Sequence, residues 1–92
     1  MEIVTQGKEY QLKTVDGKWL RVVFYHKENE EKHDGVTSEE VLEMLINRHS
    51  HMAVNSPSEE NINTVTHLKQ ALMFIKARHL NKLRKKKHFE YR

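Results

Sequence analysis

The pattern of apolar and polar positions changes character about a third of the way along the chain. Before that point, two β-prone runs at residues 10–13 and 19–25 flank the dipeptide Asp16-Gly17, which is a strong tight-turn signal. The runs predict a β-hairpin, followed by a charged connector at residues 28–35. Because an isolated hairpin is only marginally stable in water, we expect its apolar face to pack on helices or on another chain.

After the connector, the apolar residues recur at the spacing of a helix instead of a strand. Thr37 and Glu40 have the S/T-x-x-E spacing of a capping box, in which a hydroxyl and a carboxylate bind free amide groups at a helix start. The apolar positions that follow fall on one face at helical spacing. They predict a helix that ends near Met52 and whose stripe comprises Val41, Leu42, Leu45, Ile46, His49 and Met52.

A second capping box, Ser56 to Glu59, predicts the start of a second helix and is strengthened by Pro57 at the first helical position. No further proline or glycine interrupts the chain, so this helix is expected to reach about Lys86, roughly 45 Å at about 1.5 Å per residue. The first helix can cover only about half of that length, so we expect an antiparallel hairpin with a protruding arm. Its apolar stripe comprises Ile62, Val65, Leu68, Leu72, Ile75 and Leu83.

The predicted fold is therefore α+β, an N-terminal β-hairpin followed by a long antiparallel helical hairpin, and oligomeric. We expect a single domain over residues 1–92, with the β-hairpin and connector at 1–34, the helical hairpin at 35–86 and a basic tail at 87–92. Only 37% of the residues are hydrophobic and 32% are charged. Such a thin core favours self-association into a dimer or a larger homo-oligomer.

The composition also indicates the cellular compartment in which the chain is expected to work. The chain contains no cysteine, so neither a disulfide framework nor a cysteine-ligated zinc site can stabilise it, and a reducing intracellular compartment is expected. The longest apolar run, residues 71–75, is far shorter than the roughly 18 residues of a membrane span. The first residues do not have the pattern of a secretory signal. The sequence therefore predicts a cytoplasmic protein without a membrane partner.

The net charge of +3 hides a strong segregation of charge. From position 76 onward there are eight Lys and Arg residues and one acidic residue, whereas the preceding 75 residues contain eight basic and twelve acidic residues. This pattern favours an anionic partner for the C-terminal segment, whether a phosphate-containing ligand, a nucleic acid or an acidic protein surface.

The residue pattern gives little support for catalysis or for metal binding. Seven histidines invite a metal hypothesis, but His49 and His51 lie two positions apart and point to different sides of a helix. His49 and His79 fit hydrogen-bonded core or interface histidines better than ligands. No nucleophile motif or phosphate-cradling glycine loop is present. We therefore expect no enzyme, no catalytic residue, no metal and no other cofactor.

Phosphate binding is better supported by the sequence than catalysis or metal binding. Arg78 and Lys82 are four residues apart and hence neighbours on one helical face. The planar fork of arginine donates two hydrogen bonds to a phosphate at once, and lysine adds a mobile point charge. The same pair is equally typical of a solvated basic face that complements the C-terminal dipole of its helix.

Two segments resemble a known phage family. They are GVTSEEVLEMLINR at residues 35–48, and SEEN at 58–61 followed by THLKQALMFIKAR at 66–78. These segments are similar to the anti-Thoeris signal sponges, whose helical hairpin is shared with sponges that counter the cyclic-oligonucleotide defence CBASS. The match covers residues 35–82, about half of the chain. The preceding β-hairpin fits the anti-Thoeris branch better than the all-helical anti-CBASS branch.

The resemblance implies binding without turnover in the cytoplasm of an infected bacterium. Family members capture cyclic ADP-ribose isomers made by Toll/interleukin-receptor domain proteins, and some also hold cyclic di- or trinucleotides at a separate site. Asn61 matches the family's asparagine after Arg-Glu, Arg78 matches the arginine that closes the Leu-Met-Trp-Leu segment, and Lys82 stands where a second arginine is usual. His51 lies near an aromatic position that helps to hold the ligand.

The chain departs from the family pattern at three places. Glu59 replaces an arginine, Ser58 replaces a cysteine, and a basic tail replaces a glycine-rich one. A glutamate near a phosphate repels it, whereas the basic tail attracts anions over a longer range. Two alternatives to the sponge stay open: a small basic nucleic-acid-binding regulator that uses the C-terminal helix end, and a structural helical-hairpin protein without a small ligand.

Overall fold

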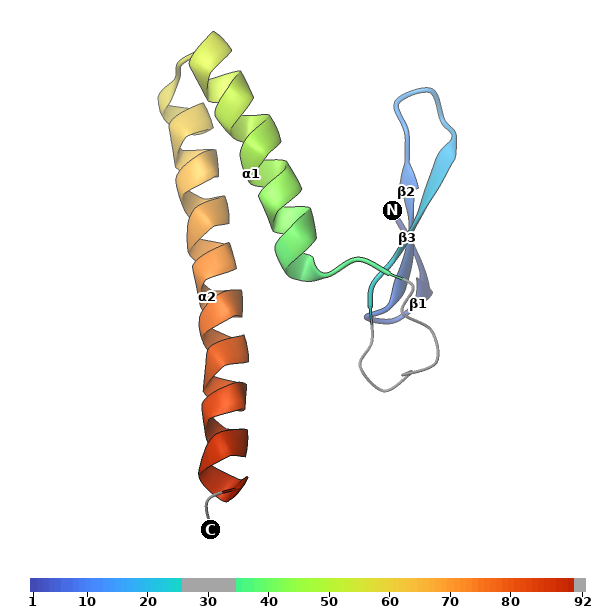
Figure 1. The fold of residues 1–92 in the computed structure, drawn as a ribbon. Helices are drawn as coiled ribbons and strands as arrows, with labels where there is room; N and C mark the ends of the chain where they lie inside the picture. The colour runs from blue at the N-terminus through green and yellow to red at the C-terminus, as the bar shows by residue number, and fades with distance from the viewer. Residues whose placement is uncertain (26–34, 91–92) are drawn as a thin grey trace. The chain divides into compact units, whose positions relative to one another are not determined.

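The computed structural model describes residues 1–25 and 35–90, with side chains up to residue 85 (Figure 1). The chain forms two compact units, Met1–Ser38 and Glu39–Arg92. Most of the predicted connector lies outside the described residues, as do the side chains of the predicted basic tail.

The N-terminal unit is a three-stranded antiparallel sheet in the order β1-β2-β3, formed by β1 (Glu2–Thr5), β2 (Glu9–Lys13) and β3 (Trp19–Val23) (Figure 1). The predicted hairpin is confirmed as β2 and β3. The prediction of a two-stranded element was wrong, because β1 adds a third strand to the edge of β2. A turn closed by the Lys8 amide, which donates to the Thr5 carbonyl at 3.0 Å, brings this short strand back onto β2.

Thr14 organises the turn between β2 and β3. The Thr14 amide donates to the Lys18 carbonyl at 2.8 Å, the Lys18 amide donates back to the Thr14 hydroxyl at 2.9 Å, and that hydroxyl binds the Asp16 carboxylate. The Thr14 hydroxyl thereby lowers the pKa of Asp16 below its usual value. Gly17, with φ at 84°, supplies the left-handed backbone that the Asp-Gly signal anticipated.

The register of the sheet separates an apolar face from a mixed face, which carries Trp19 and Val23 beside polar residues. Pairing of Tyr10 with Val22, Leu12 with Leu20 and Ile3 with Tyr10 places these side chains on one face, because side chains alternate along a strand. On the opposite face Arg21 Nη2 donates to Glu9 Oε1 at 2.8 Å, which lowers the pKa of Glu9. None of the described side chains of this unit is buried. Within this unit, the described residues do not form the second layer that a stable sheet requires.

Gly35 returns the chain to the edge of β3. The Val36 amide donates to the Val23 carbonyl and the Tyr25 amide to the Val36 carbonyl, both at 2.8 Å, forming a short parallel bridge. Gly35 has φ at 134°, and a Cβ at this position would lie 2.6 Å from the Tyr25 amide nitrogen. The bridge therefore tolerates only glycine at position 35.

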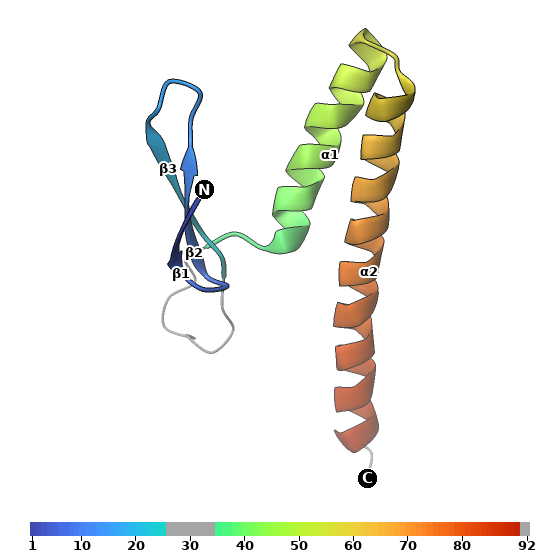
Figure 2. The same cartoon turned by 180° about the vertical axis from the view of Figure 1, so that it is seen from behind.

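The second unit is the predicted antiparallel helical hairpin, built from α1 (Ser38–Asn55) and α2 (Glu59–Glu90) (Figures 1 and 2). The helices are 18 and 32 residues long, so α1 faces little more than half of α2, as predicted. Both helices run beyond the predicted ends at Met52 and Lys86. Lys76 Nζ lies 3.7 Å from Glu43 Oε1 and links the two helices.

Contacts between α1 and α2 leave their apolar side chains half-buried at best. The half-buried apolar residues are Val41, Leu42, Leu45, Ile46, Ala53, Val65, Leu68, Ala71, Leu72 and Ile75. Three members of the predicted stripes do not belong to this contact, since Met52, Ile62 and Leu83 are exposed. Within the ranges that carry side chains, no hydrophobic residue is fully buried. The described part of the chain therefore has no closed core.

Candidate ligand site

Asn61 lies at the start of α2 and is part of the helix cap. The Ser58 hydroxyl accepts a hydrogen bond from the Asn61 amide at 3.0 Å, and Asn61 Nδ2 donates to the Ser56 carbonyl at 2.8 Å. The cap is therefore Ser58, and the prediction of a capping box at Ser56 was wrong. The half-buried Asn61 side chain retains its carbonyl oxygen and one amide hydrogen for other partners.

His51 is exposed near the end of α1. Its ring Nε2 lies 2.9 Å from Asn55 Nδ2, one helical turn further along. The two side chains are therefore within hydrogen-bond distance of each other. Positions that face α2, such as His49, are half-buried, so the exposure of His51 places it on another side of α1.

Arg78 and Lys82 lie on the C-terminal half of α2, and both are exposed. Phe74 precedes Arg78 by four residues and thus shares its face, with 68% of its surface exposed. Neither cation forms an ion pair with a carboxylate among the described side chains. We call these three residues the basic-aromatic face of α2.

The structure brings Arg78 and Lys82 together but not Asn61 or His51 with them. Asn61 and Arg78 are 17 positions apart on a continuous helix, about 25 Å at about 1.5 Å per residue. A single small nucleotide cannot reach both side chains of one chain. The four residues could form one site only if two chains contribute to it.

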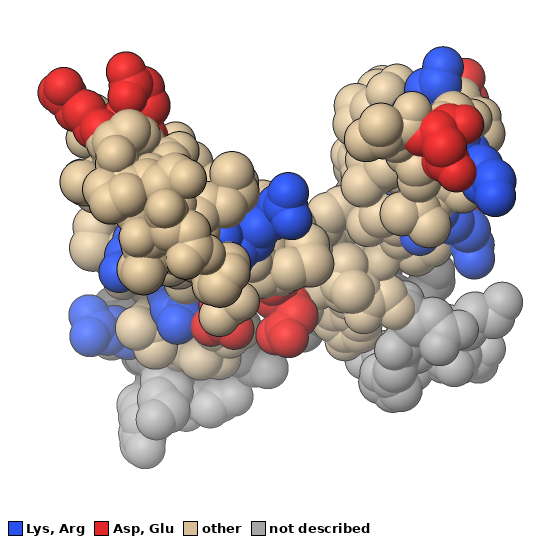
Figure 3. Space-filling model, turned by 90° about the horizontal axis from the view of Figure 1, so that it is seen from above, with Lys and Arg blue, Asp and Glu red and all other residues tan. Residues whose placement is uncertain are grey.

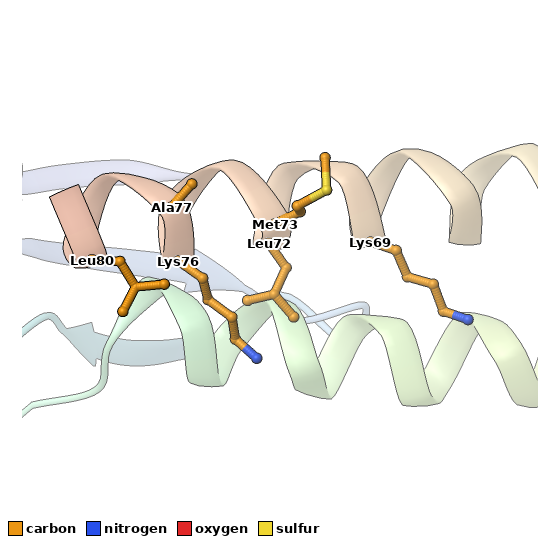
Figure 4. A pocket seen from close by; sticks show the side chains of 6 residues that line it. All are labelled: Lys69, Leu72, Met73, Lys76, Ala77 and Leu80. Carbon is orange, nitrogen blue, oxygen red and sulfur yellow. The ribbon is translucent and has the colours of Figure 1, made fainter.

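A groove on α2 was not predicted from the sequence. It has a volume of about 440 Å³ and is lined by Lys69, Leu72, Met73, Lys76, Ala77 and Leu80 (Figure 4). In Figure 4, Leu72 and Lys76 extend towards α1 and Met73 extends away from it. The available signal was the alternation of four- and three-residue steps at positions 69, 73, 76 and 80, which differs from the stripe that faces α1.

No set of three or more histidine, cysteine or carboxylate side chains lies close enough to hold a metal ion within the described part of the chain. The helices of that part include none with the length and apolar content needed to cross a membrane.

The chain matches no protein-family model, no curated protein and no solved structure.

Proposed function

We propose that this chain is a phage anti-defence sponge, which sequesters a cyclic nucleotide immune signal in the cytoplasm of the infected bacterium. The ligand would be a cyclic ADP-ribose isomer of Thoeris or a cyclic oligonucleotide of CBASS. The observation that carries the proposal is the exposed basic-aromatic face of Phe74, Arg78 and Lys82. It lies within the segment that resembles the anti-Thoeris sponges.

The three side chains of this face suit the parts of a nucleotide. The Arg78 guanidinium can donate two parallel hydrogen bonds to one phosphate, and the Lys82 ammonium can follow a second phosphate as a point charge. The exposed Phe74 ring offers a stacking surface for a base, an interaction worth about 1–3 kcal/mol per base. Together they provide charge and stacking on adjacent turns of one helix.

The proposed site includes two chains. Asn61 of one copy would offer its remaining amide hydrogen and carbonyl oxygen to a base edge or ribose, while Arg78 and Lys82 of the other copy bind phosphates. His51, exposed near the end of α1, would supply an aromatic ring to the ligand from the same end of the hairpin as Asn61. This arrangement requires a homo-oligomer, a dimer or a hexamer. It allows Asn61 and Arg78 to bind one ligand from two chains, although they lie about 25 Å apart within one chain.

The proposed activity is capture without chemical conversion. The basic-aromatic face contains hydrogen-bond donors, cations and an aromatic ring, which bind an anionic ligand but do not by themselves cleave it. Such a protein acts stoichiometrically, so that the defence effector is never activated.

Mixing two inactive variants tests whether the site is shared. We expect Asn61→Ala and Arg78→Ala homo-oligomers to bind a cyclic ADP-ribose isomer poorly. After subunit exchange, each dimer that contains one chain of each kind regains one intact site of two. Calorimetry on the exchanged mixture measures the recovered binding.

Ser58→Ala is the matched control for this experiment. It removes the hydroxyl that caps α2 and costs about 1 kcal/mol of stability, but it leaves the Asn61 amide in place. We expect it to retain ligand binding. If the exchanged mixture regains no binding, or if Ser58→Ala abolishes binding as Asn61→Ala does, Asn61 acts on the helix start rather than on ligand.

A nucleic-acid-binding regulator is the second candidate. Lys82, Arg84 and Lys85 are all exposed near the end of α2 and, at about 100° per residue, point in different directions around it. Charge distributed around a helix suits a phosphate backbone better than one small ligand.

A further inference from the structure

The C-terminal part of α2 extends past the packing that α1 provides. Half-buried residues recur along α2 from Asn61 to Ile75, whereas every residue from Lys76 to Lys85 is exposed. The Lys76 ammonium, 3.7 Å from Glu43 Oε1 of α1, marks the boundary. We call residues 76–85 the α2 end. It contributes no half-buried side chain to the helical hairpin.

The α2 end has little packing to stabilise its helix. Helices in proteins derive most of their stability from packing an apolar face. Leu80 and Leu83 of the α2 end are 54% and 46% exposed. His79 and Asn81 also rank below alanine, leucine and lysine as helix formers. A segment with so few packed contacts opens locally at a low cost in free energy.

Like charges weaken the helix of the same segment. Arg78 and Lys82 are four residues apart and Lys82 and Lys85 are three apart, so each pair lies side by side on the helix surface and destabilises it. Glu59 and Glu60 occupy the first turn of α2, at the end of the hairpin where acidic atoms project in Figure 3. They lie about 27 Å from Arg78 at about 1.5 Å per residue, well beyond the screening length of about 8–10 Å. These carboxylates therefore do not offset the repulsion among the cations.

A bound phosphate reverses the effect of these charges. In a helix, Cβ atoms four residues apart lie about 5–6 Å apart, so Arg78 and Lys82 can bind one diphosphate together. In an extended chain the same positions lie about 13 Å apart at about 3.3 Å per residue. A ligand that bridges the two cations therefore binds the helical form of the α2 end rather than the open form. By mass action it stabilises the helical form.

We propose that anion binding and helix formation are coupled in the α2 end: the segment opens readily in the free protein, and a phosphate bound by Arg78 and Lys82 holds it helical. The inference rests on the proposed function for the anion site at these two residues, and it adds that the ligand completes its own site. The apparent dissociation constant is then the intrinsic one divided by the helical fraction of the α2 end. Helix stability at positions that do not contact the ligand therefore changes how tightly the ligand binds.

A pair of alanine and glycine variants at position 79 tests the coupling. His79→Ala and His79→Gly remove the same ring from an exposed position between the two cations, and they differ from each other only in helix propensity. We expect the glycine variant to bind inorganic pyrophosphate about three- to fivefold more weakly than the alanine variant. Titration followed by the NMR shifts of the α2 amides, at constant ionic strength, measures both dissociation constants.

Gln70→Ala and Gln70→Gly are the matched control pair. Position 70 is also exposed, but it lies in the part of α2 that packs on α1, and this packing keeps the part helical in both variants. We expect the two control variants to bind pyrophosphate with the same affinity. In the wild-type protein, saturating pyrophosphate is expected to slow hydrogen exchange of the amides at residues 80–85 and to leave those at residues 65–75 unchanged.

The outcomes separate the coupling from the proposed function. Weaker binding by His79→Gly, together with equal binding by the Gln70 pair, supports the coupling. Equal affinities of the two His79 variants would overturn it, as would amides at 80–85 that exchange without pyrophosphate as slowly as those at 65–75. An equally large difference within the Gln70 pair would also overturn it, because opening would then not be confined to the α2 end.

Titration of the same variants with a cyclic ADP-ribose isomer tests the proposed function separately. Saturable binding of the isomer with equal affinities of the two His79 variants would leave the function standing without the coupling. Binding of pyrophosphate with the expected difference, but no binding of the isomer, would leave the coupling standing without the function.

Discussion

Replacing Arg78 by alanine is expected to weaken the binding of a cyclic ADP-ribose isomer about 30- to 1000-fold, a loss of about 2–4 kcal/mol. The exposed guanidinium has no carboxylate partner among the described side chains, so it is available to a phosphate. Without it, the phosphate of the bound ligand loses a bidentate, charge-assisted partner. Calorimetric titration of the wild-type protein and the variant measures the difference.

Arg48→Ala is the matched control for this prediction. It removes the same exposed side chain and the same charge, but from α1 rather than from the basic-aromatic face. We expect its affinity to stay within about threefold of wild type, because surface charges act only weakly through water. Equal losses for both variants would contradict a site at Arg78 and would indicate a general electrostatic attraction.

Replacing Gly35 by alanine is expected to destabilise the N-terminal sheet by about 3 kcal/mol. The new Cβ would lie 2.6 Å from the Tyr25 nitrogen and 2.8 Å from the Phe24 carbonyl carbon, both backbone atoms of the bridge to β3. The bridge must open or the backbone must shift. Trp19 on β3 is the only tryptophan, so the midpoint of its fluorescence change in denaturant reports on this unit.

Gly17→Ala separates the clash from the cost of the backbone angle. Gly17 also has a positive φ, at 84°, but no atom outside its own chain neighbours lies within 4 Å of a Cβ built there. The expected destabilisation is therefore about 1 kcal/mol, the backbone term alone. If Gly35→Ala is no worse than Gly17→Ala, the close approach of residue 35 to β3 does not occur in solution.

Local patterns were enough to predict the two helices and the β2–β3 hairpin, because each has its own start or turn signal. The capping residues before Glu40, the Asp16-Gly17 turn and the long uninterrupted helical period all act over a few residues. Strand β1 has no such signal. It is four residues long, and an irregularity between Ile3 and Thr5 interrupts its pairing, so only the partner strand defines it.

The start of α2 shows why a cap cannot always be located from spacing. Ser56 precedes Glu59 by three residues and Ser58 precedes Asn61 by three, so both serines have a plausible capping partner. In the structure the Ser58 hydroxyl binds the Asn61 amide, and the Asn61 side chain closes the turn on the Ser56 carbonyl. The two bonds together favour Ser58, and they depend on a turn geometry that the sequence does not specify.

The candidate site was only partly accessible to sequence reasoning. A spacing of four places Arg78 and Lys82 on one face of α2 whatever surrounds it. The groove on α2 could not be separated from the stripe that packs on α1, because its apolar lining residues also recur at helical spacing. Only the exposure of Met73, beside the half-buried Leu72, shows that α1 leaves part of the groove uncovered. The ligand roles of Asn61, Arg78, Lys82 and His51 stay predictions.

Capture of an intact ligand tests the central claim most directly. The protein is titrated calorimetrically with a cyclic ADP-ribose isomer at about 50 and about 200 mM salt, then heated, and the released ligand is identified. The account predicts saturation at one ligand per chain, a modest loss of affinity between the two salt concentrations and recovery of unchanged ligand. Absence of saturable binding, or recovery of a hydrolysed product missing from a protein-free control, would contradict it. Binding of DNA or RNA instead, with an affinity that falls about a thousandfold or more over the same salt range, would identify the nucleic-acid regulator.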